Sequence, residues 1–396
     1  MDQERRRIKL GGRLQGLGLR PLVWRIATSI GLTGLVRNQA DGVCIEVQGE
    51  LPDIEQFILR LHEQLPVSAR IDSEEIDRIP ADKPDPSLLP GFVIQSSQGQ
   101  GFSLCDALPD MAPCEDCLSE LFDPASSRYL YPMNSCTQCG PRYSIQTGTP
   151  FDRGQTTLNA FPLCSCCRRE YTDPDNRRFH AQTISCFECG PKWIWKERNA
   201  HQIDCTEPHR VESMLDRFEQ ILRSDGIVLV KGVGGYQLLC DATSQQATLQ
   251  IRKMKNREHK PFAVLVESLV QATKIVNLSP EACVALQQSH RPIVIASRER
   301  ADRTSKDDLG AWICEFDYSL GIMLPNSPMQ YLLARRMGRP MVVTSANVSG
   351  EPMLIDDQLA FIRFGDQVDA ILMNDRPIAE PLDDPVVCDT HVGLIP

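Results

Sequence analysis

Eight cysteines of this chain form four Cys-x2-Cys pairs, a spacing that is typical of zinc ligands. Eighteen residues separate the first pair from the second and the third pair from the fourth, and the later set lies fifty positions after the earlier one. Two thiolates beside a tight turn can bind one tetrahedral zinc ion, and a second pair completes its ligands. We therefore predict two structural zinc sites with no open coordination position for catalysis. The predicted ligands are Cys114, Cys117, Cys136, Cys139, Cys164, Cys167, Cys186 and Cys189.

The residues around the cysteines repeat as well. Residues 120–124 correspond to residues 170–174, and a Gly-Pro dipeptide follows the last cysteine of each copy. Such self-similarity indicates one supersecondary unit that is used twice. The sequence leaves open whether each copy holds its own zinc ion or the copies exchange pairs. Cys166, inside the third pair, could compete as a ligand, and His180 is either a hydrogen-bonded structural histidine or a functional one.

Length and composition restrict the class of protein. The chain has 396 residues, which is enough for two to four domains, and a formal net charge of −10, which argues against nucleic acid as the main partner. It contains sixteen cysteines, no apolar leader after Met1, and no apolar run near the ~20 residues that cross a bilayer. We therefore expect a cytoplasmic protein without membrane association, whose paired thiolates bind metal rather than form disulfides.

A glycine-rich loop near the N-terminus predicts a phosphate site. Residues 12–21 (GRLQGLGLRP) join an expected strand to an expected helix, so several backbone N–H groups and a helix N-terminus meet at one point. Arg20 could add a bidentate guanidinium. Asn38, where a strand meets a turn, could orient an attacking water. The alternative interpretation of both features is ordinary turn chemistry.

Two further clusters predict a polyphosphate site in the second half of the chain. A glycine-rich segment, 231–236, follows an apolar run; five cations fall within residues 252–260; and residues 344–352 carry small hydroxyl and amide side chains after another apolar run. The carboxyl ends of strands are where α/β sheets bind ligands. A solvated charged face and a helix cap are the alternatives. The candidate nucleotide contacts are Lys231, Lys255, Arg257, Lys260, Thr344, Ser345 and Asn347.

The expected elements that position these residues fall into three domains, so the fold class is a multidomain mixture of α/β and α+β. Residues 1–97 alternate strand and helix signals in the order βαββαβ, which predicts a ferredoxin-like domain with a helix opening at Pro21 and a hairpin at Asp41-Gly42. A linker rich in Pro and Asp follows at 81–91. Residues 105–195 form the zinc module, and residues 205–390 show the buried strands and amphipathic helices of an α/β domain.

The N-terminal pattern resembles the acylphosphatase family, in which a G-x-V-Q-G-V-G-F-R loop and a G-W-V-R-N strand carry the catalytic arginine and asparagine. The matching positions are Arg20 and Asn38. The resemblance implies that water attacks an acyl phosphate, that the loop and Arg20 neutralise phosphoryl charge, and that Asn38 holds the water.

The C-terminal clusters resemble the YrdC-like family, which carries K-x-R-x-x-x-K-P and S-x-N motifs around a nucleotide. These motifs match Lys255, Arg257 and Lys260, and then Ser345 and Asn347. The resemblance implies activation of a carboxylate or carbamate by transfer to AMP with release of pyrophosphate. Lys231 and Thr344 are expected as additional contacts.

The order of the three parts resembles the HypF family of nickel–iron hydrogenase maturation. This resemblance implies a carbamoyltransferase that hydrolyses carbamoyl phosphate and couples the carbamate to ATP, with magnesium, as carbamoyl-adenylate. In the family a further C-terminal domain passes the carbamoyl group to the C-terminal cysteine of a HypE-type protein, and the group becomes a cyanide ligand of the hydrogenase iron. The expected partners are therefore carbamoyl phosphate, ATP and a HypE-type protein.

The chain also departs from the family pattern. It stops at Pro396, so we expect the transfer domain to be absent and carbamoyl transfer to need a separate subunit. Asp384-Pro385 stands where the family carries Asp-Ser, Thr183 replaces a proline, and Asn326 and Gln330 replace a tyrosine and a histidine. A truncated or degenerate paralogue acting as a non-catalytic zinc scaffold is therefore the first alternative, and a threonylcarbamoyl-adenylate synthase the second. The sequence does not indicate the oligomeric state.

Overall fold

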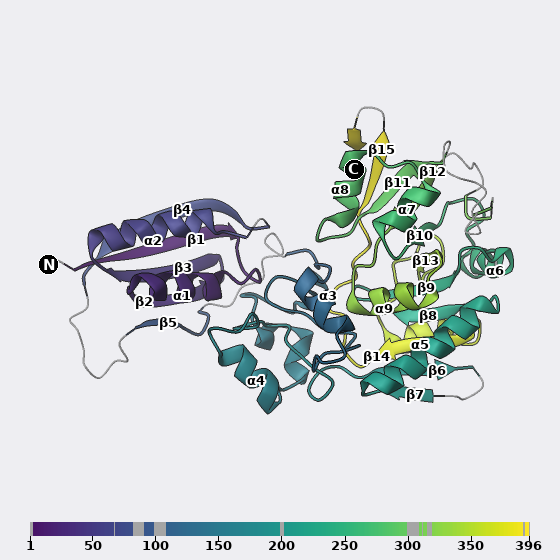
Figure 1. The fold of residues 1–396 in the computed structure, drawn as a ribbon, viewed down its shortest axis with the longest axis horizontal. Helices are drawn as coiled ribbons and strands as arrows, with labels where there is room; N and C mark the ends of the chain where they lie inside the picture. Colours follow the sequence, from purple (N-terminus) through teal and green to yellow (C-terminus); the bar gives the residue numbers. More distant parts are fainter. Residues whose placement is uncertain are drawn as a thin grey trace. The chain divides into compact units, whose positions relative to one another are not determined.

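A computed structural model describes residues 3–66, 68–81, 91–98, 108–198, 202–298, 309–310, 312–314, 319–390 and 393–395 (Figure 1). Backbone contacts divide the chain into two compact units. The first unit comprises Met1–Pro109, Cys136–Gln138 and Ile145–Ile184, and the second comprises Asp110–Ser135, Cys139–Ser144 and Ser185–Pro396. Most of the linker expected at 81–91, and the domain boundary expected at residue 105, lie outside the described residues.

The first unit contains a five-stranded sheet in the order β4-β1-β3-β2-β5. β1 to β4 pair antiparallel and β5 pairs parallel with β2, and the chain order βαββαβ confirms the ferredoxin-like prediction. The turn at Asp41-Gly42 joins β2 to β3, as predicted. The elements are β1 (Glu4–Arg13), α1 (Leu19–Ile30), β2 (Thr33–Gln39), β3 (Gly42–Gly49), α2 (Leu51–Glu63), β4 (Arg70–Ile79) and β5 (Phe92–Ile94).

Both helices of this sheet pack against one of its faces, where they bury a single apolar core (Figure 1). Val23 of α1 and Phe57 of α2 are fully buried against strand residues such as Ile45. The helix predicted to open at Pro21 begins at Leu19 instead. Pro21 still lies in the first turn, where a missing N–H costs no helical hydrogen bond, so the proline is tolerated there.

The cysteine-rich part of the chain has short helices and little sheet. The two copies of the repeat open on equivalent eight-residue helices, and three short 3₁₀ turns lie between them. The elements are α3 (Glu115–Phe122), η2 (Tyr143–Ile145), η3 (Arg153–Gln155), η4 (Thr157–Ala160) and α4 (Ser165–Thr172). Since such short elements bury few apolar side chains, metal ligation is expected to stabilise this part of the fold.

An eleven-stranded mixed sheet forms the second unit, in the order β16-β15-β11-β12-β10-β13-β9-β8-β14-β6-β7. The predicted strands near 228, 263, 293 and 341 are present as β8 (Val228–Lys231), β10 (Ala263–Leu265), β11 (Ile293–Ser297) and β13 (Met341–Ser345). The other strands were not predicted; they are β6 (Trp193–Glu197), β7 (Gln202–Cys205), β9 (Tyr236–Asp241), β12 (Ser319–Met323), β14 (Ala370–Asn374), β15 (Val386–Thr390) and β16 (Gly393–Ile395).

Two apolar cores lie on opposite faces of this sheet, because successive strand side chains point to opposite sides. In β8, for example, Leu229 joins one core whereas Val228 and Val230 join the other. One face is covered by α5 (Pro208–Arg223) and α9 (Pro328–Met337), together with Leu121 and Leu130 of the first cysteine repeat. The other face is covered by α6 (Gln245–Lys255), α7 (Leu269–Ile275), α8 (Pro280–Gln287) and α10 (Asp357–Phe364). In the described part of the chain, no helix has the length and apolar character needed to span a membrane.

Strand directions place the predicted nucleotide contacts at one edge of the sheet. β9 pairs antiparallel with both β8 and β13, so the carboxyl ends of β8 and β13 lie beside the start of β9. Lys231 thus pairs with Tyr236, and Ser345 pairs with Gln237. β10 pairs antiparallel with β13, which brings the segment before β10 to the same edge.

Candidate functional site

The predicted phosphate loop joins β1 to α1 and is built on glycines with positive φ. Gly16 and Gly18 both have φ near 76°, and Gly18 caps the N-terminus of α1 in the left-handed conformation. A Cβ atom at Gly18 would lie 3.1 Å from the Cβ of Thr137, so a larger residue would be strained on two grounds. The loop therefore presents its backbone and a helix N-terminus at one point, as an anion site requires.

Arg20 lies at the start of α1 and is 8% exposed. One terminal nitrogen donates to the Asp152 carboxylate at 2.6 Å, and the other donates to the Ser97 hydroxyl at 3.3 Å. Ser97 in turn donates a short hydrogen bond to the second carboxylate oxygen of Asp152. The guanidinium is thus held by a carboxylate and a hydroxyl from distant parts of the chain.

Asn38 is the other predicted catalytic residue of this site. It lies near the carboxyl end of β2, is 2% exposed, and pairs with Val43, which in turn pairs with Leu10 of β1. This register places Asn38 at the end of the sheet from which the phosphate loop emerges. Its backbone oxygen accepts from the Gln98 amide at 3.0 Å, which ties the residue to the segment after β5.

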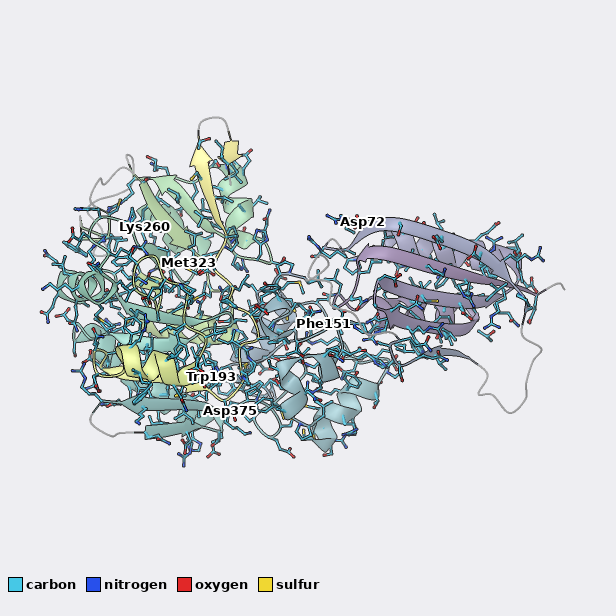
Figure 2. The ribbon with its side chains drawn as sticks, turned by 180° about the vertical axis from the view of Figure 1, so that it is seen from behind. Asp72, Phe151, Trp193, Lys260, Met323 and Asp375 are labelled. Carbon is cyan, nitrogen blue, oxygen red and sulfur yellow. The ribbon has the colours of Figure 1, made fainter. Side chains whose placement is uncertain are left out.

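Gln15 fixes the loop on both sides. Its amide nitrogen donates to the backbone oxygens of Gln39 and Gly42, at 2.6 and 3.0 Å, and its amide oxygen accepts from the Phe151 N–H at 2.8 Å. Phe151 (labelled in Figure 2) also lines a small pocket beside Gly12 and Ala40. The loop is therefore braced by the β2–β3 turn and by the segment between the two cysteine repeats.

The second cysteine repeat packs against the helix that carries Arg20. The Trp24 ring of α1 meets the Phe179 ring edge-on at 5.5 Å between centroids. Arg25 donates to the backbone oxygens of Pro174 and Asn176 at 3.1 to 3.3 Å. The part of the repeat up to Ile184 belongs to the same compact unit as the phosphate loop.

The eight predicted metal ligands form two clusters, and each cluster uses the cysteines of one copy of the repeat. Within each cluster the four sulfur atoms all lie within 4.8 Å of one another. The Cys117 and Cys139 sulfurs are 3.4 Å apart and the Cys186 and Cys189 sulfurs are 3.8 Å apart. Tetrahedral zinc with Zn–S bonds of about 2.3 Å places sulfurs about 3.8 Å apart, so the donor sets fit this ion. Exchange of pairs between copies does not occur, and Cys166 is exposed and lies outside both clusters.

The two copies also match in their hydrogen bonds. The Leu130 amide donates to the Leu121 oxygen at 2.8 Å, and the equivalent His180 amide donates to the Tyr171 oxygen at 2.9 Å. Leu130 and His180 both have φ of 56°. A histidine thus stands in the second copy where the first copy has a core leucine.

His180 packs between the rings of Tyr171 and Phe179 at 5.0 and 4.6 Å between centroids. Burial, and then the nearby positive charge of Arg20, lower the pKa of His180 to about 4. The imidazole is therefore neutral at pH 7, as a packed structural histidine would be.

Lys255 is the centre of the predicted nucleotide site. Its ammonium donates to the Ser345 backbone oxygen through a short bond, and to the backbone and side-chain oxygens of Asn347 at 2.9 and 2.8 Å. The Ser345 hydroxyl donates to the same Asn347 side-chain oxygen at 2.6 Å. Burial, and then the neighbouring cations Arg257 and Lys260, lower the pKa of Lys255 to about 7. The two predicted motifs therefore meet in space.

Arg257 lies beside this cluster, with its guanidinium 5.0 Å from the Phe262 ring centroid and 3.5 Å from the Thr344 hydroxyl. Burial lowers the pKa of Arg257 to about 10. The Lys260 side chain (labelled in Figure 2) is exposed on the loop before β10. Arg257 and Lys260 lie close enough to Lys255 to lower its pKa, and the Thr344 hydroxyl lies beside Arg257. Such a group of cations and hydroxyls suits the binding of a polyphosphate.

Lys231 lies at the same sheet edge but is bound to other partners. Its ammonium is fully buried, lies 2.6 Å from the Asp357 carboxylate, and donates to the Asn374 backbone oxygen at 2.9 Å. The Tyr236 hydroxyl also donates to Asp357, at 2.9 Å. Burial lowers the pKa of Lys231 below its usual value despite this carboxylate. If Lys231 contacts a phosphate directly, its ammonium must be shared between that phosphate and the Asp357 carboxylate.

The departures from the family pattern are connected to one another. Asn326 donates to the Asp384 carboxylate at 3.0 Å, and its backbone N–H donates to the Gln330 side chain at 3.0 Å. Gln330 then donates to the side chain of Gln237, the residue after Tyr236 on β9, at 3.1 Å. Burial, and then repulsion from Asp383, raise the pKa of Asp384 to about 6. The replaced residues thus form one polar network; Thr183, the fourth departure, is buried in the other unit.

Sequence reasoning missed several residues that contact the predicted ones. Ser97, Asp152, Asp357 and Asn374 were not expected, because each reaches its partner across more than seventy residues of chain. The signal available for Asp152 was its place in the Phe-Asp-Arg motif between the repeats.

Three family models match the chain. The acylphosphatase model matches residues 6–94, the HypF finger model matches residues 114–146 and 163–195, and the Sua5/YciO/YrdC model, described as telomere recombination, matches residues 220–394. These matches confirm the predicted succession of an acylphosphatase-like part, a cysteine-rich part and a YrdC-like part.

Curated relatives and solved structures match nearly the whole chain. The carbamoyltransferase HypF2 of Cupriavidus necator is 40% identical over 96% of this chain and 47% of its own length, and the carbamoyltransferase HypF of Rhodobacter capsulatus is 39% identical over 96% and 48%. A crystal structure of full-length HypF in a phosphate- and nucleotide-bound form superposes with a TM-score of 0.88 at 36% identity, over 98% of this chain and 49% of that one. The chain spans about half the length of the curated relatives that it matches.

Proposed function

The chain belongs to the HypF family, and we propose that it hydrolyses carbamoyl phosphate and captures the released carbamate with ATP as carbamoyl-adenylate. The observation that carries the proposal is the presence on one chain of two cation-centred sites of different design: Arg20 behind a glycine loop, and Lys255 held by Ser345 and Asn347. We further propose that the carbamoyl group is destined for the C-terminal cysteine of a HypE-type protein and for a cyanide ligand of a hydrogenase.

In the first step, water attacks the phosphorus of carbamoyl phosphate and the P–O bond to the carbamoyl group breaks. The products are carbamate, inorganic phosphate and one proton. Loop N–H groups and Arg20 stabilise the negative charge on the phosphoryl oxygens, and the Asn38 side chain orients the water. Because carbamate is a good leaving group, no strong base is required.

In the second step, a carbamate oxygen attacks the α-phosphorus of ATP and pyrophosphate leaves. Lys255, Arg257 and Lys260 neutralise the phosphate chain, and the Thr344, Ser345 and Asn347 side chains bind its oxygens. Magnesium supplied with ATP adds further charge neutralisation when it is bound. Water must be excluded at this stage, since the adenylate is a reactive mixed anhydride.

The two zinc ions have a structural part in this proposal. Each four-cysteine cluster would hold one ion with every coordination position filled, so neither ion can bind substrate. Their contribution is to fold the segment that braces the phosphate loop through Phe151 and the second repeat.

Isotope exchange tests the proposal and separates it from its alternatives. The 396-residue chain is mixed with ATP, magnesium, carbamoyl phosphate and labelled pyrophosphate. We expect label to enter ATP only when carbamoyl phosphate is present. Exchange that depends on threonine and bicarbonate instead would indicate a threonylcarbamoyl-adenylate synthase. No exchange and no phosphate release would indicate a non-catalytic scaffold.

Arg20→Ala tests the first site separately. Loss of a charge-assisted phosphate contact should reduce phosphate release roughly 100- to 1,000-fold. Arg25→Ala is the matched control, since Arg25 lies on the same helix but contacts backbone oxygens of the second repeat. Equal rates for Arg20→Ala and the unmodified chain would remove Arg20 from the mechanism.

A further inference from the structure

Arg20, the residue proposed to bind the phosphoryl group, already has an anionic partner in this chain. The Asp152 carboxylate accepts from Arg20 at 2.6 Å through one oxygen and from the Ser97 hydroxyl through the other. Ser97 also accepts from Arg20, so the three side chains form a closed triangle. We infer that Asp152 is a positioning residue of the acylphosphatase-like site, which holds Arg20 in place and competes with phosphate for its guanidinium.

The place of Asp152 in the chain supports a role beyond local structure. It occupies the N-cap position of η3, where an aspartate ordinarily accepts a hydrogen bond from the helix backbone, yet its side chain makes no such bond. The carboxylate is directed to Arg20 and Ser97 instead. Because the Asp152 side chain does not cap η3, we infer that the ion pair with Arg20, and not the turn, determines its orientation.

The two neighbours of Asp152 in sequence, Phe151 and Arg153, are held by hydrogen bonds to different segments of the chain. The Phe151 N–H donates to the Gln15 side chain in the phosphate loop. Arg153 donates to the backbone oxygens of Phe161, Gln182 and Ile184 at 2.7 to 2.9 Å. The carboxylate is thereby supported between the phosphate loop and the second cysteine repeat, and both supports belong to the same compact unit.

The charges around Arg20 make Asp152 the relevant counter-ion. His180 faces the same pair from the second repeat, but its low pKa leaves it neutral at pH 7. Asp152 therefore partly neutralises Arg20, and a carboxylate this close to the guanidinium repels an incoming phosphate dianion. The side chain of Asp152 is 29% exposed, against 9% for that of Arg20, so the carboxylate has room to move aside.

This arrangement has a consequence for turnover, and the inference rests on the proposed hydrolysis of an acyl phosphate. Inorganic phosphate remains in the loop after the carbamate has left, and tight product binding would slow the next cycle. Asp152 returns to Arg20 as phosphate departs, which weakens product binding without removing the arginine that the transition state needs. The residue thus separates the affinity for phosphate from the stabilisation of the transition state.

The test is the affinity of the full chain for inorganic phosphate, measured by calorimetry and as an inhibition constant in hydrolysis of carbamoyl phosphate. Asp152→Asn keeps the size and removes the charge, and Asp152→Ser removes the charge with a different shape. Asp175→Asn is the control, because Asp175 is an exposed aspartate of the second repeat. Zinc content and the melting temperature of each variant report whether the fold is intact.

We expect both Asp152 variants to bind phosphate roughly 3- to 10-fold more tightly than the unmodified chain, the effect of removing one nearby negative charge in a partly screened site. We also expect kcat to fall while KM falls with it, and Asp175→Asn to change nothing. Phosphate affinity that is unchanged or weaker in folded Asp152 variants overturns the inference. If the unmodified chain hydrolyses carbamoyl phosphate in that case, the proposed function survives; if no variant hydrolyses it or binds phosphate, both fail.

Discussion

Two buried cations, Arg20 and Lys255, face different kinds of acceptor, and the difference suits different tasks. Arg20 meets a full carboxylate charge from Asp152, whereas Lys255 meets the neutral oxygens of Ser345 and Asn347. An ion pair keeps an arginine oriented but lowers its attraction for an anion. Neutral acceptors orient a lysine without cancelling the charge that it carries when it is protonated. The second arrangement suits tight binding of a polyphosphate, and the first suits rapid release of a small anion.

The pKa of Lys255 near 7 predicts that nucleotide binding is coupled to proton uptake. In the ligand-free chain above pH 7, most of the amine is neutral. A bound triphosphate favours the charged form and raises the pKa, so up to about one proton is taken up at pH 7.5 to 8. Uptake should disappear below pH 6, where the free amine is already protonated. Calorimetry of ATP binding in buffers of different ionisation enthalpy measures this uptake.

Lys255→Met should abolish the proton uptake and weaken ATP binding by at least tenfold. Lys253→Met is the matched control, since Lys253 lies on the same helix, α6, and is exposed. Proton uptake that persists in Lys255→Met would assign the titration to another group. Phosphate release from carbamoyl phosphate should be normal in both variants, because the Arg20 site lies in the other unit.

At the scale of elements, the two copies of the cysteine repeat pack against different parts of the chain. Leu121 and Leu130 of the first copy join the apolar core under α5 and α9. Phe179 of the second copy packs on Trp24, beside the phosphate loop. The same backbone arrangement therefore packs against different neighbours, and the side chains at equivalent positions differ, as Leu130 and His180 do.

Removal of one ligand from each copy should therefore have different effects. Cys117→Ser and Cys167→Ser change equivalent positions, and each should reduce the zinc content from two ions to about one per chain. Cys117→Ser should mainly weaken ATP binding, and Cys167→Ser should mainly weaken phosphate binding. Metal analysis and calorimetry measure both quantities.

Cys166→Ser is the control for these two variants, because Cys166 is exposed and lies outside both clusters. It should retain two zinc ions and both affinities. Identical losses of ATP and phosphate binding in Cys117→Ser and Cys167→Ser would show that the copies do not divide their work in this way.

At the scale of the whole molecule, the chain consists of two compact units with separate cores. Among the described residues, the first unit buries a core between a five-stranded sheet and its helices, together with a small cluster around Phe151. The second unit buries cores on both faces of an eleven-stranded sheet. Because each unit has its own core, each is expected to unfold as its own cooperative transition.

Phe57→Ala and Phe218→Ala test this expectation, since both rings are fully buried, one in each unit. Each substitution should cost about 3–5 kcal/mol through lost burial and a residual cavity. Differential scanning calorimetry should show two transitions, of which Phe57→Ala lowers one and Phe218→Ala lowers the other. A single transition that shifts in both variants would mean that the chain unfolds as one body.

The sequence by itself determined the features that depend on neighbours along the chain. The cysteine pairs with two residues between them, the glycine loop before α1, the hairpin at Asp41-Gly42 and the apolar runs of β8 and β13 could all be predicted, because spacing and local backbone preference determine them. The assignment of particular cations to a phosphate or nucleotide site rests on family motifs and stays a prediction.

Only the tertiary structure decided which distant groups meet. It assigned each zinc cluster to one copy of the repeat, joined Lys255 to Asn347 across 92 residues, and placed Asp152 on Arg20 across 132 residues. Short polar segments and unpredicted strands such as β14 carry little periodic signal, and their partners are set by sheet order and packing rather than by spacing. Contacts over such separations depend on the closure of the whole fold, which no local pattern specifies.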